Sequence, residues 1–161
     1  MAYRLGKEIQ TMSKSYYVYN NEAIASLVLE KTLRLLNEIE ISRFLLILPI
    51  LLEDRIILKL RTSNFSNFEE LLRKHPTLFA NFNDRYLDLL PISINSLTLL
   101  KEMGVLMTSK NRIFYNSNYQ QLSQSASSNR LESIAGQLEN FVSLTAGYET
   151  NTLYKILKIR L

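Results

Sequence analysis

The stretch that decides the fold is LLPISINSLTLLKEMGVLMTSKNRIFY, residues 89–115. After Pro91, residues 92–103 carry apolar side chains at helical spacing, and Gly104 follows as a candidate C-cap. Two short β-prone segments with polar turn residues between them come next, which predicts a β-hairpin over residues 105–115. Helix, proline turn, helix and hairpin in this order predict a winged helix-turn-helix-like centre.

The helix before the proline turn is expected to start at Pro76, since proline is well placed at a first helical position. Its aromatic and aliphatic residues fall on one face: Phe79, Phe82, Tyr86 and Leu90. A shorter helix precedes it and ends at His75, because the residue before a proline avoids the helical region. Ser66 and Glu69 have the spacing of a capping box at its start.

The most apolar segment, residues 44–52, is predicted to lie at the centre of the core. Pro49 falls inside it. Because a proline ring clashes with the carbonyl four residues back, here that of Leu45, we expect a kink at this point or a helix that ends near Leu48 and restarts.

An earlier helix, predicted over residues 22–37, is apolar around most of its circumference and should be buried on nearly all sides. Glu30 and Arg34 are one turn apart in the favourable order, and we expect them to form a solvated bridge. They belong to a polar stripe that is predicted to face water and consists of Ser26, Glu30, Arg34 and Asn37.

These segments predict a mainly α fold, a helical domain whose winged helix-turn-helix-like centre contains one small β-hairpin. Residues 1–19 are expected to form an N-terminal arm, and residues 20–115 the helical core with the winged-helix-like unit. The Ser-, Asn- and Gln-rich residues 116–129 are expected to form a polar loop. Residues 130–161 are expected to form C-terminal helices packed on the core.

Composition excludes several kinds of chemistry. With no cysteine and a single histidine among 161 residues, thiolate and histidine-rich metal sites are impossible. The four glycines lie far apart, whereas phosphate-binding loops need them clustered. We therefore expect no cofactor, no metal and no catalytic role. No segment is long and apolar enough for a signal sequence or a membrane span, so a cytoplasmic protein without membrane contact is expected.

One enzymatic alternative rests on acidic side chains. A nuclease could hold Mg²⁺ through carboxylates, and the candidates are Glu53, Asp54, Glu69 and Glu70. These residues also fit ordinary helix ends and caps, which favours a structural role for them.

Five segments, in order, resemble one known family. They are YNNEAIASLVLEKTLRLL (19–36), FLLILPILLEDR (44–55), SNFEELLRKHPTLFANF (66–82), LLPISINSLTLLKEMGVL (89–106) and AGQLENFVSLTAGYETNTLYKILKIRL (135–161). Over residues 16–161 the chain is similar to the middle components of bacterial three-component ABC systems, a group that includes the small subunit of Lamassu-type anti-phage systems. The most specific matches are Asn20, the L-x-L-P-x-L-L pattern at 46–52 and the T-x-x-x-x-L-x-I pattern at 152–159.

This resemblance implies a non-enzymatic accessory subunit of an antiviral complex. It implies binding to an SMC-like ABC ATPase, coupling to a nuclease-like effector subunit, and help in sensing DNA through a non-specific contact of the complex with double-stranded DNA. The alternative is a free-standing winged-helix DNA-binding transcriptional regulator. Protein contact is favoured over base reading, because the polar face of helix 92–103 carries one lysine and one glutamate.

Two sets of residues are candidates for these contacts. Aromatic residues suit partner binding, since their bodies are apolar and their tips polar; the candidates are Tyr16, Tyr17, Tyr19, Phe114 and Tyr115. Cations in the hairpin and the C-terminal tail could contact DNA phosphates; the candidates are Lys110, Arg112, Lys155, Lys158 and Arg160.

Overall fold

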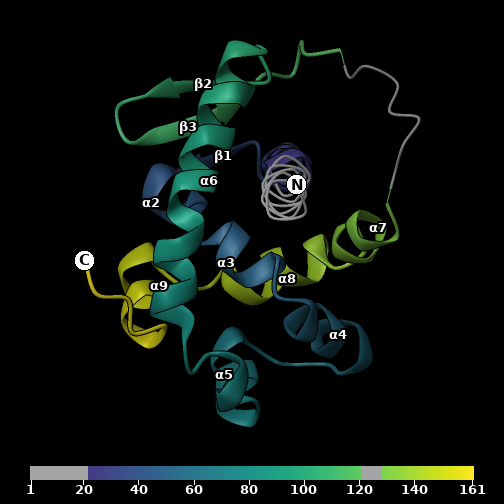
Figure 1. Cartoon of the computed structure of the whole chain (residues 1–161), viewed down its shortest axis with the longest axis vertical. Helices are drawn as coiled ribbons and strands as arrows, with labels where there is room; N and C mark the ends of the chain where they lie inside the picture. Colours follow the sequence, from purple (N-terminus) through teal and green to yellow (C-terminus); the bar gives the residue numbers. More distant parts are fainter. Residues whose placement is uncertain (1–21, 121–127) are drawn as a thin grey trace, which may run out of the picture.

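The computed structural model describes residues 22–120 and 128–161, and these are mainly helical with one small antiparallel sheet (Figure 1). The described part of the first helix covers residues 22–36. The other helices are α2 (Ile41–Phe44), α3 (Ile47–Leu51), α4 (Asp54–Thr62), α5 (Phe68–Lys74), the 3-10 turn η1 (Pro76–Leu78), α6 (Phe82–Glu102), α7 (Asn129–Ala135), α8 (Leu138–Thr145) and α9 (Thr150–Ile156). None of the described helices has the length and apolar character needed to cross a bilayer.

The predicted hairpin is confirmed. β2 (Leu106–Ser109) pairs antiparallel with β3 (Arg112–Tyr115), and Lys110 opens the two-residue turn with a left-handed φ of 54°. The sheet also has a third strand that the sequence did not predict. This strand, β1 (Glu38–Glu40), pairs with β3 on its other edge, so the strand order is β1-β3-β2.

The predicted turn at Pro91 is wrong. α6 continues through Pro91 as one helix of 21 residues, and it begins at Phe82 and not at Pro76. A proline inside a helix costs about 3 kcal/mol through its missing N–H and its clash with the carbonyl four residues back, here that of Leu87. Both residues lie on the exposed side of α6, where water can satisfy that carbonyl. Burial of the opposite side of α6 against the core offsets the remaining free-energy cost of the proline. One long helix therefore replaces the predicted helix-turn-helix pair.

Gly104 caps the C-terminus of α6 as predicted. Its φ is 74°, and its N–H donates to the Lys101 carbonyl (3.0 Å). The Val105 N–H donates to the Leu100 carbonyl (2.9 Å), which completes a Schellman motif. The cap turns the chain directly from α6 into β2.

The apolar segment 44–52 lies at the centre of the core, as predicted. All five residues of α3 are buried, Pro49 among them. The helix breaks earlier than expected, at Leu45 and Leu46, between α2 and α3. This is the place of the carbonyl that the Pro49 ring would strike, and the break leaves Pro49 in the first turn of α3, where no N–H is needed.

The polar stripe of the first helix is more buried than expected. Glu30 is 4% exposed and Ser26 8%, although Arg34 remains exposed. The Glu30 carboxylate lies 3.7 Å from the Arg34 Nε and accepts from the Tyr115 hydroxyl of β3 (3.5 Å). The prediction that this ion pair is solvated is therefore wrong for Glu30, because the sheet covers this side of the helix.

The cap of α5 also differs from the prediction. Asn67, and not Ser66, is the N-cap, and its side chain accepts from the Glu70 N–H (2.9 Å). The Glu70 carboxylate reaches back to accept from the Ser66 N–H (2.6 Å) and pairs with Lys74 (2.7 Å). The cap thus lies one residue later than expected, and the Glu70 carboxylate bonds the N–H of the residue before the N-cap, not that of Asn67 as a capping box requires.

This arrangement makes a prediction about pH. The hydrogen bond from Lys74, followed by that from the Ser66 N–H, lowers the pKa of Glu70 from 4.5 to about 2. Because the folded pKa lies below the unfolded one, the contact stabilises the fold above pH 4.5 and is lost as the pH falls towards 2. A carboxyl-detected NMR titration should give a midpoint near 2 for Glu70, and Lys74→Met should raise it. A midpoint unchanged by Lys74→Met would contradict the assignment.

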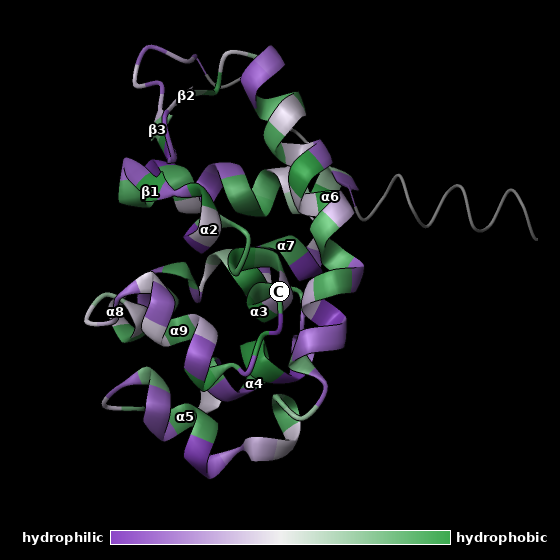
Figure 2. Ribbon diagram, turned by 90° about the vertical axis from the view of Figure 1, so that its left-hand side faces the viewer, coloured by the Kyte–Doolittle hydropathy of each residue, from purple (hydrophilic) through white to green (hydrophobic). Residues whose placement is uncertain are grey.

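The two sides of the molecule differ in what they carry. Figure 2 shows α6 on one side, and β1, α8 and α9 on the other. α6 runs along most of the long axis, with the hairpin at one end and α5 near the other (Figure 1). The molecule therefore has two separate faces, one formed by α6 and the other by β1, α8 and α9.

Candidate functional site

Exposed large hydrophobic side chains concentrate on α6 and the strand that follows it. Of the eight such side chains in the described residues, five lie there. We call these five the α6–β2 surface: Leu87, Ile94, Leu99, Met103 and Met107. Scattered single hydrophobics are normal on a protein surface, whereas a concentration on one continuous element indicates a binding surface.

Helical spacing divides this surface into two parts. Leu87, Pro91 and Ile94 follow one another at i, i+4 and i+7, so they share the outer face of α6. At about 100° per residue, Leu99 and Met103 lie roughly 120° or more round the helix from Leu87 and Ile94, near the end from which the chain continues to Met107 on β2. The acidic side chains along α6 are also exposed, at Asp84, Asp88 and Glu102.

A groove separates the C-terminal half of α6 from the hairpin. Lysines lie on both sides of it, Lys101 on α6 and Lys110 in the turn, together with one carboxylate, Glu102. Its other lining residues are Ile41, Leu97, Thr98 and Thr108. Of the predicted phosphate contacts in the hairpin, Lys110 is exposed. Arg112 lies on the central strand, β3, and forms an ion pair with Glu38 of β1 (3.1 Å).

The aromatic residues of β3 are divided between the two faces of the sheet. Phe114 pairs with Met107 and is half-buried, so it borders the α6–β2 surface. Tyr115 pairs with buried Leu106 and donates to Glu30. Burial, and then the charge of Glu30, raise the pKa of Tyr115. Phe114 therefore has the better position for contact with a partner, and Tyr115 closes the sheet over the first helix.

The three cations of the C-terminal tail stay exposed. Lys155 lies in the last turn of α9, and Lys158 follows it with a φ of 56°. The Lys158 and Ile159 N–H groups bond back to α9 as in a Schellman motif. The Arg160 N–H donates to the Asn83 side chain at the start of α6 (2.8 Å). The tail is thus fixed by its backbone, while its charged side chains face solvent.

The predicted aromatic arm lies outside the described residues, and Tyr16, Tyr17 and Tyr19 with it. The same holds for residues 121–127 of the predicted polar loop.

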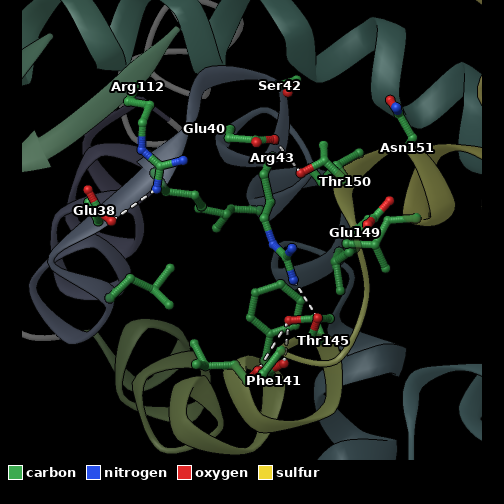
Figure 3. A pocket seen from close by; sticks show the side chains of 18 residues that line it. Glu38, Glu40, Ser42, Arg43, Arg112, Phe141, Thr145, Glu149, Thr150 and Asn151 are labelled. Atoms are coloured by element: carbon green, nitrogen blue, oxygen red, sulfur yellow. Dashed lines mark hydrogen bonds and ion pairs between the residues drawn. The ribbon is translucent and has the colours of Figure 1, made fainter. Parts of the chain in front are cut away.

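A pocket opens on the side away from α6, between β1 and α2 on one wall and α8 and α9 on the other (Figure 3). Its volume is about 580 Å³. The charged residues at its rim are Glu38, Glu40, Arg43, Arg112 and Glu149. Apolar side chains that include Leu46, Ile47, Phe141 and Val142 line the inner part. The sequence did not predict this site.

Two contacts hold the walls of this pocket together. The Arg43 guanidinium crosses it and donates to the carbonyl of Thr145 at the end of α8 (Figure 3), where the helix dipole favours a cation. It also donates to the carbonyl of Tyr148, just beyond that helix. The Thr150 hydroxyl at the start of α9 donates to the Glu40 carboxylate (2.6 Å). Desolvation lowers the pKa of Arg43, and the nearby charge of Glu40 opposes that shift.

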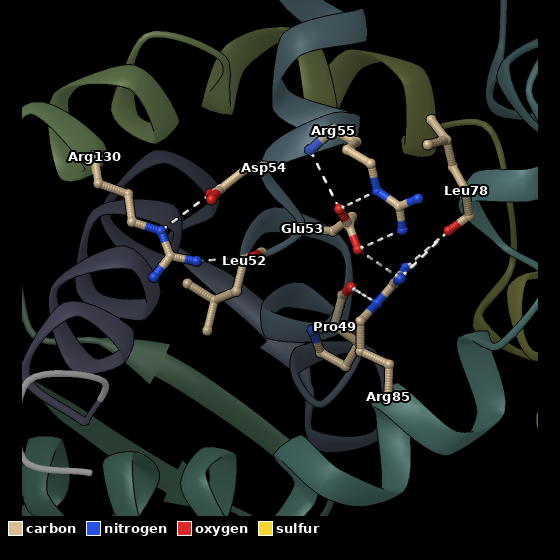
Figure 4. A network of polar contacts seen from close by, with 8 residues as sticks. All are labelled: Pro49, Leu52, Glu53, Asp54, Arg55, Leu78, Arg85 and Arg130. Atoms are coloured by element: carbon tan, nitrogen blue, oxygen red, sulfur yellow. Dashed lines mark hydrogen bonds and ion pairs between the residues drawn. The ribbon is translucent and has the colours of Figure 1, made fainter. Parts of the chain in front are cut away.

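Three of the four carboxylates considered for a nuclease site, Glu53, Asp54 and Glu70, pair with different cations, and Figure 4 shows the first two. Glu53 bonds Arg55 (2.8 Å) and Arg85 (3.1 Å), and the hydrogen bond from Arg55 is the main cause of its lowered pKa. Asp54 pairs with Arg130 (3.0 Å). No group of three or more potential metal ligands occurs among the residues that the structure describes. In this arrangement the acidic residues brace helix ends.

Arg85 is the centre of that network. Its guanidinium also donates to the carbonyls of Pro49 (2.7 Å) and Leu78 (3.3 Å), so it links α6 to the end of α3 and to η1 (Figure 4). Burial lowers the pKa of Arg85, and the neighbouring Glu53 opposes this. The network thus fixes the N-terminal end of α6, the helix that carries most of the α6–β2 surface.

Comparison with known proteins identifies the class of this helical chain. The family model described as "ABC-three component (ABC-3C) system Middle Component 3" matches residues 9–161, nearly the whole sequence. The chain belongs to this family, and it is therefore an accessory middle component of a three-component ABC system. The resemblance to middle components is confirmed at this level. Searches of curated proteins and of solved structures give no match.

Proposed function

We propose that this chain is a non-enzymatic subunit that joins an SMC-like ABC ATPase to a nuclease-like effector in a bacterial, cytoplasmic anti-phage complex of the Lamassu type. The family supplies the expectation of partner components. Within the complex, the chain would contact both the ATPase and the effector, and a conformational change of the ATPase would be transmitted to the effector through the chain.

The observation that carries this proposal is the α6–β2 surface. Its five side chains are between 44% and 57% exposed, although each is large and apolar. Burying such side chains in an interface gains about 25 cal/mol for every Å² of apolar area removed from water. A protein-binding role accounts for this exposure on a helix that the core and the Arg85 network hold in place.

The test is co-expression with the ATPase and effector encoded beside this chain, with an affinity tag on the chain. We expect both components to elute with it through size-exclusion chromatography. Elution of the tagged chain alone, as a folded monomer, would overturn the proposal.

A contact with DNA phosphates is the second part of the proposal. The hairpin and the C-terminal tail lie at the two ends of α6 and on the same side of the molecule in Figure 1. The hairpin turn lies beside the C-terminal half of α6, and the Arg160 backbone meets the N-terminal end of the same helix. Lys110 and the tail could therefore contact the phosphates of one duplex at two places along α6.

Reversing the tail charges tests this contact. With Lys155→Glu, Lys158→Glu and Arg160→Glu together, we expect the assembled complex to bind non-specific duplex DNA about 10-fold more weakly or worse, with a shallower salt dependence. Assembly should be unchanged, because the tail is fixed through the Arg160 backbone and not through its charges. Fluorescence anisotropy at several salt concentrations measures the binding. Loss of assembly would show that the tail belongs to a protein interface.

The alternative function is a free-standing DNA-binding transcriptional regulator, which would use the hairpin and α6 in place of the expected helix-turn-helix pair. The groove between α6 and the hairpin, with Lys101 and Lys110 on its two sides, favours it. It requires a preferred duplex in a binding-site selection, with affinity lost in Lys110→Glu. Selection without any preferred sequence would exclude this alternative and leave the proposed function untouched.

A further inference from the structure

We propose that the pocket between β1–α2 and α8–α9 is a second docking site, which receives an arginine or lysine side chain from an apolar segment of a partner protein. The inference rests on the proposed function and deepens it. It gives the chain a second binding surface and specifies which side chain of the partner binds there.

Both cations of the pocket are already in use. Arg43 donates to two main-chain carbonyls, that of Thr145 at the end of α8 and that of Tyr148 just beyond it. Arg112 is paired with Glu38 at 3.1 Å. A negatively charged ligand could reach only the remaining N–H groups of these guanidinium groups, and it would face three carboxylates in the same pocket.

Two of the three carboxylates at the rim form no ion pair among the described residues, although the charge of Arg43 acts on Glu40. Glu40 accepts one hydrogen bond, from the Thr150 hydroxyl, and Glu149 is the N-cap residue of α9, although its side chain forms no capping hydrogen bond. Neither carboxylate has an ion pair within 4.0 Å among the described residues. The chain carries a net charge of +4, so an acidic rim is a local reversal of its overall charge. With three carboxylates and two guanidinium groups, the lining of the pocket has a net negative charge, which is complementary to a cation.

The inner wall suits the rest of a basic side chain. Phe141 and Val142 of α8 face the pocket beside Leu46 and Ile47. Lysine and arginine bury their methylene stems against apolar surface while the charged head stays near carboxylates. An occupant with apolar neighbours in sequence would cover the remaining wall, which a free metal ion or a small amine would leave exposed.

The position of the pocket suits a subunit that binds two partners. It lies on the side of β1, α8 and α9, whereas the α6–β2 surface lies on the other side (Figure 2). A protein seated on α6 would leave the pocket open. Two different components can therefore be held at once, which a single surface would not permit.

The test uses matched charge reversals in the complete chain. Glu149→Lys places a cation at the rim, and Glu139→Lys makes the same change at an exposed position of α8 that does not line the pocket. Binding of the ATPase and of the effector is measured separately by biolayer interferometry, with circular dichroism as a check on folding. We expect Glu149→Lys to weaken one of the two by about tenfold or more, with the other unchanged, and Glu139→Lys to weaken neither.

Two results would overturn the inference. One is binding of both components by Glu149→Lys within about twofold of wild type, and the other is equal weakening by Glu149→Lys and Glu139→Lys, which would mark a general charge effect. A wild-type chain that binds neither component would instead overturn the proposed function itself, so the two failures are distinguishable.

A crosslink identifies the occupant. The chain has no cysteine, so Asn151→Cys at the rim gives a unique attachment point for a photo-crosslinker. In the assembled complex we expect a crosslinked partner peptide with a lysine or arginine between apolar residues. A crosslink to residues 1–21 of this same chain would overturn the assignment to a partner.

Discussion

A chain that carries Leu87→Asp and Ile94→Asp is expected to bind its α6-facing partner about 100-fold more weakly than wild type. Both side chains are nearly half exposed on the outer face of α6, at 46% and 48%. The substitution removes apolar contact area and would also bury two unpaired carboxylates in the interface, which costs several kcal/mol unless they find partners. Isothermal titration calorimetry against the purified ATPase and effector measures the change.

A matched control separates this effect from a loss of stability. Leu58 on α4 is also 46% exposed and lies in a helix, but outside the α6–β2 surface. Leu58→Asp should fold and bind as wild type does. Equal binding by the α6 double variant and by wild type would mean that the outer face of α6 is not an interface.

Replacing Phe44 by alanine should lower the free energy of unfolding by about 3–5 kcal/mol. Phe44 is fully buried at the end of α2, next to the break that precedes α3. Alanine would leave a cavity beside the most buried helix of the molecule, and close-packed surroundings relax only in part. Urea denaturation followed by circular dichroism gives the change in free energy.

The control for this prediction is Leu35→Ala on the first helix. Leu35 is 41% exposed, so its truncation should cost about 1 kcal/mol or less. A cost for Phe44→Ala as small as that for Leu35→Ala would contradict the central position of α2 and α3 in the core.

Local signals were sufficient where structure is decided locally. The hairpin was predictable because two β-prone segments flank polar turn residues, and the end of α6 because Gly104 follows the last apolar turn. The burial of α3 followed from nine consecutive apolar residues. In each case the decisive residues lie within one or two turns of one another.

Local rules failed where distant contacts decide. Pro91 reads as a helix breaker, but burial along the other side of α6 outweighs its local cost. β1 has three residues and pairs with β3, more than 70 positions later, so no periodicity could reveal it. The helical wheel placed Glu30 in water because it contains no information about the strand that covers it.

The pocket was not predictable for the same reason. Arg43 and Glu40 are ordinary residues in sequence, and their partners Thr145 and Thr150 lie more than 100 positions away. The one available signal was a lone arginine just before the most apolar segment of the chain, which needs polar partners once it is half-buried.

Reconstitution by omission tests the account most directly. The ATPase and effector encoded beside this chain are purified and mixed with and without it, and complex masses are measured by size-exclusion chromatography with light scattering. We expect a three-component complex when the chain is present, and separate ATPase and effector when it is absent. Stable association of ATPase and effector without the chain, with the chain left as a free monomer, would contradict its role as the joint between them.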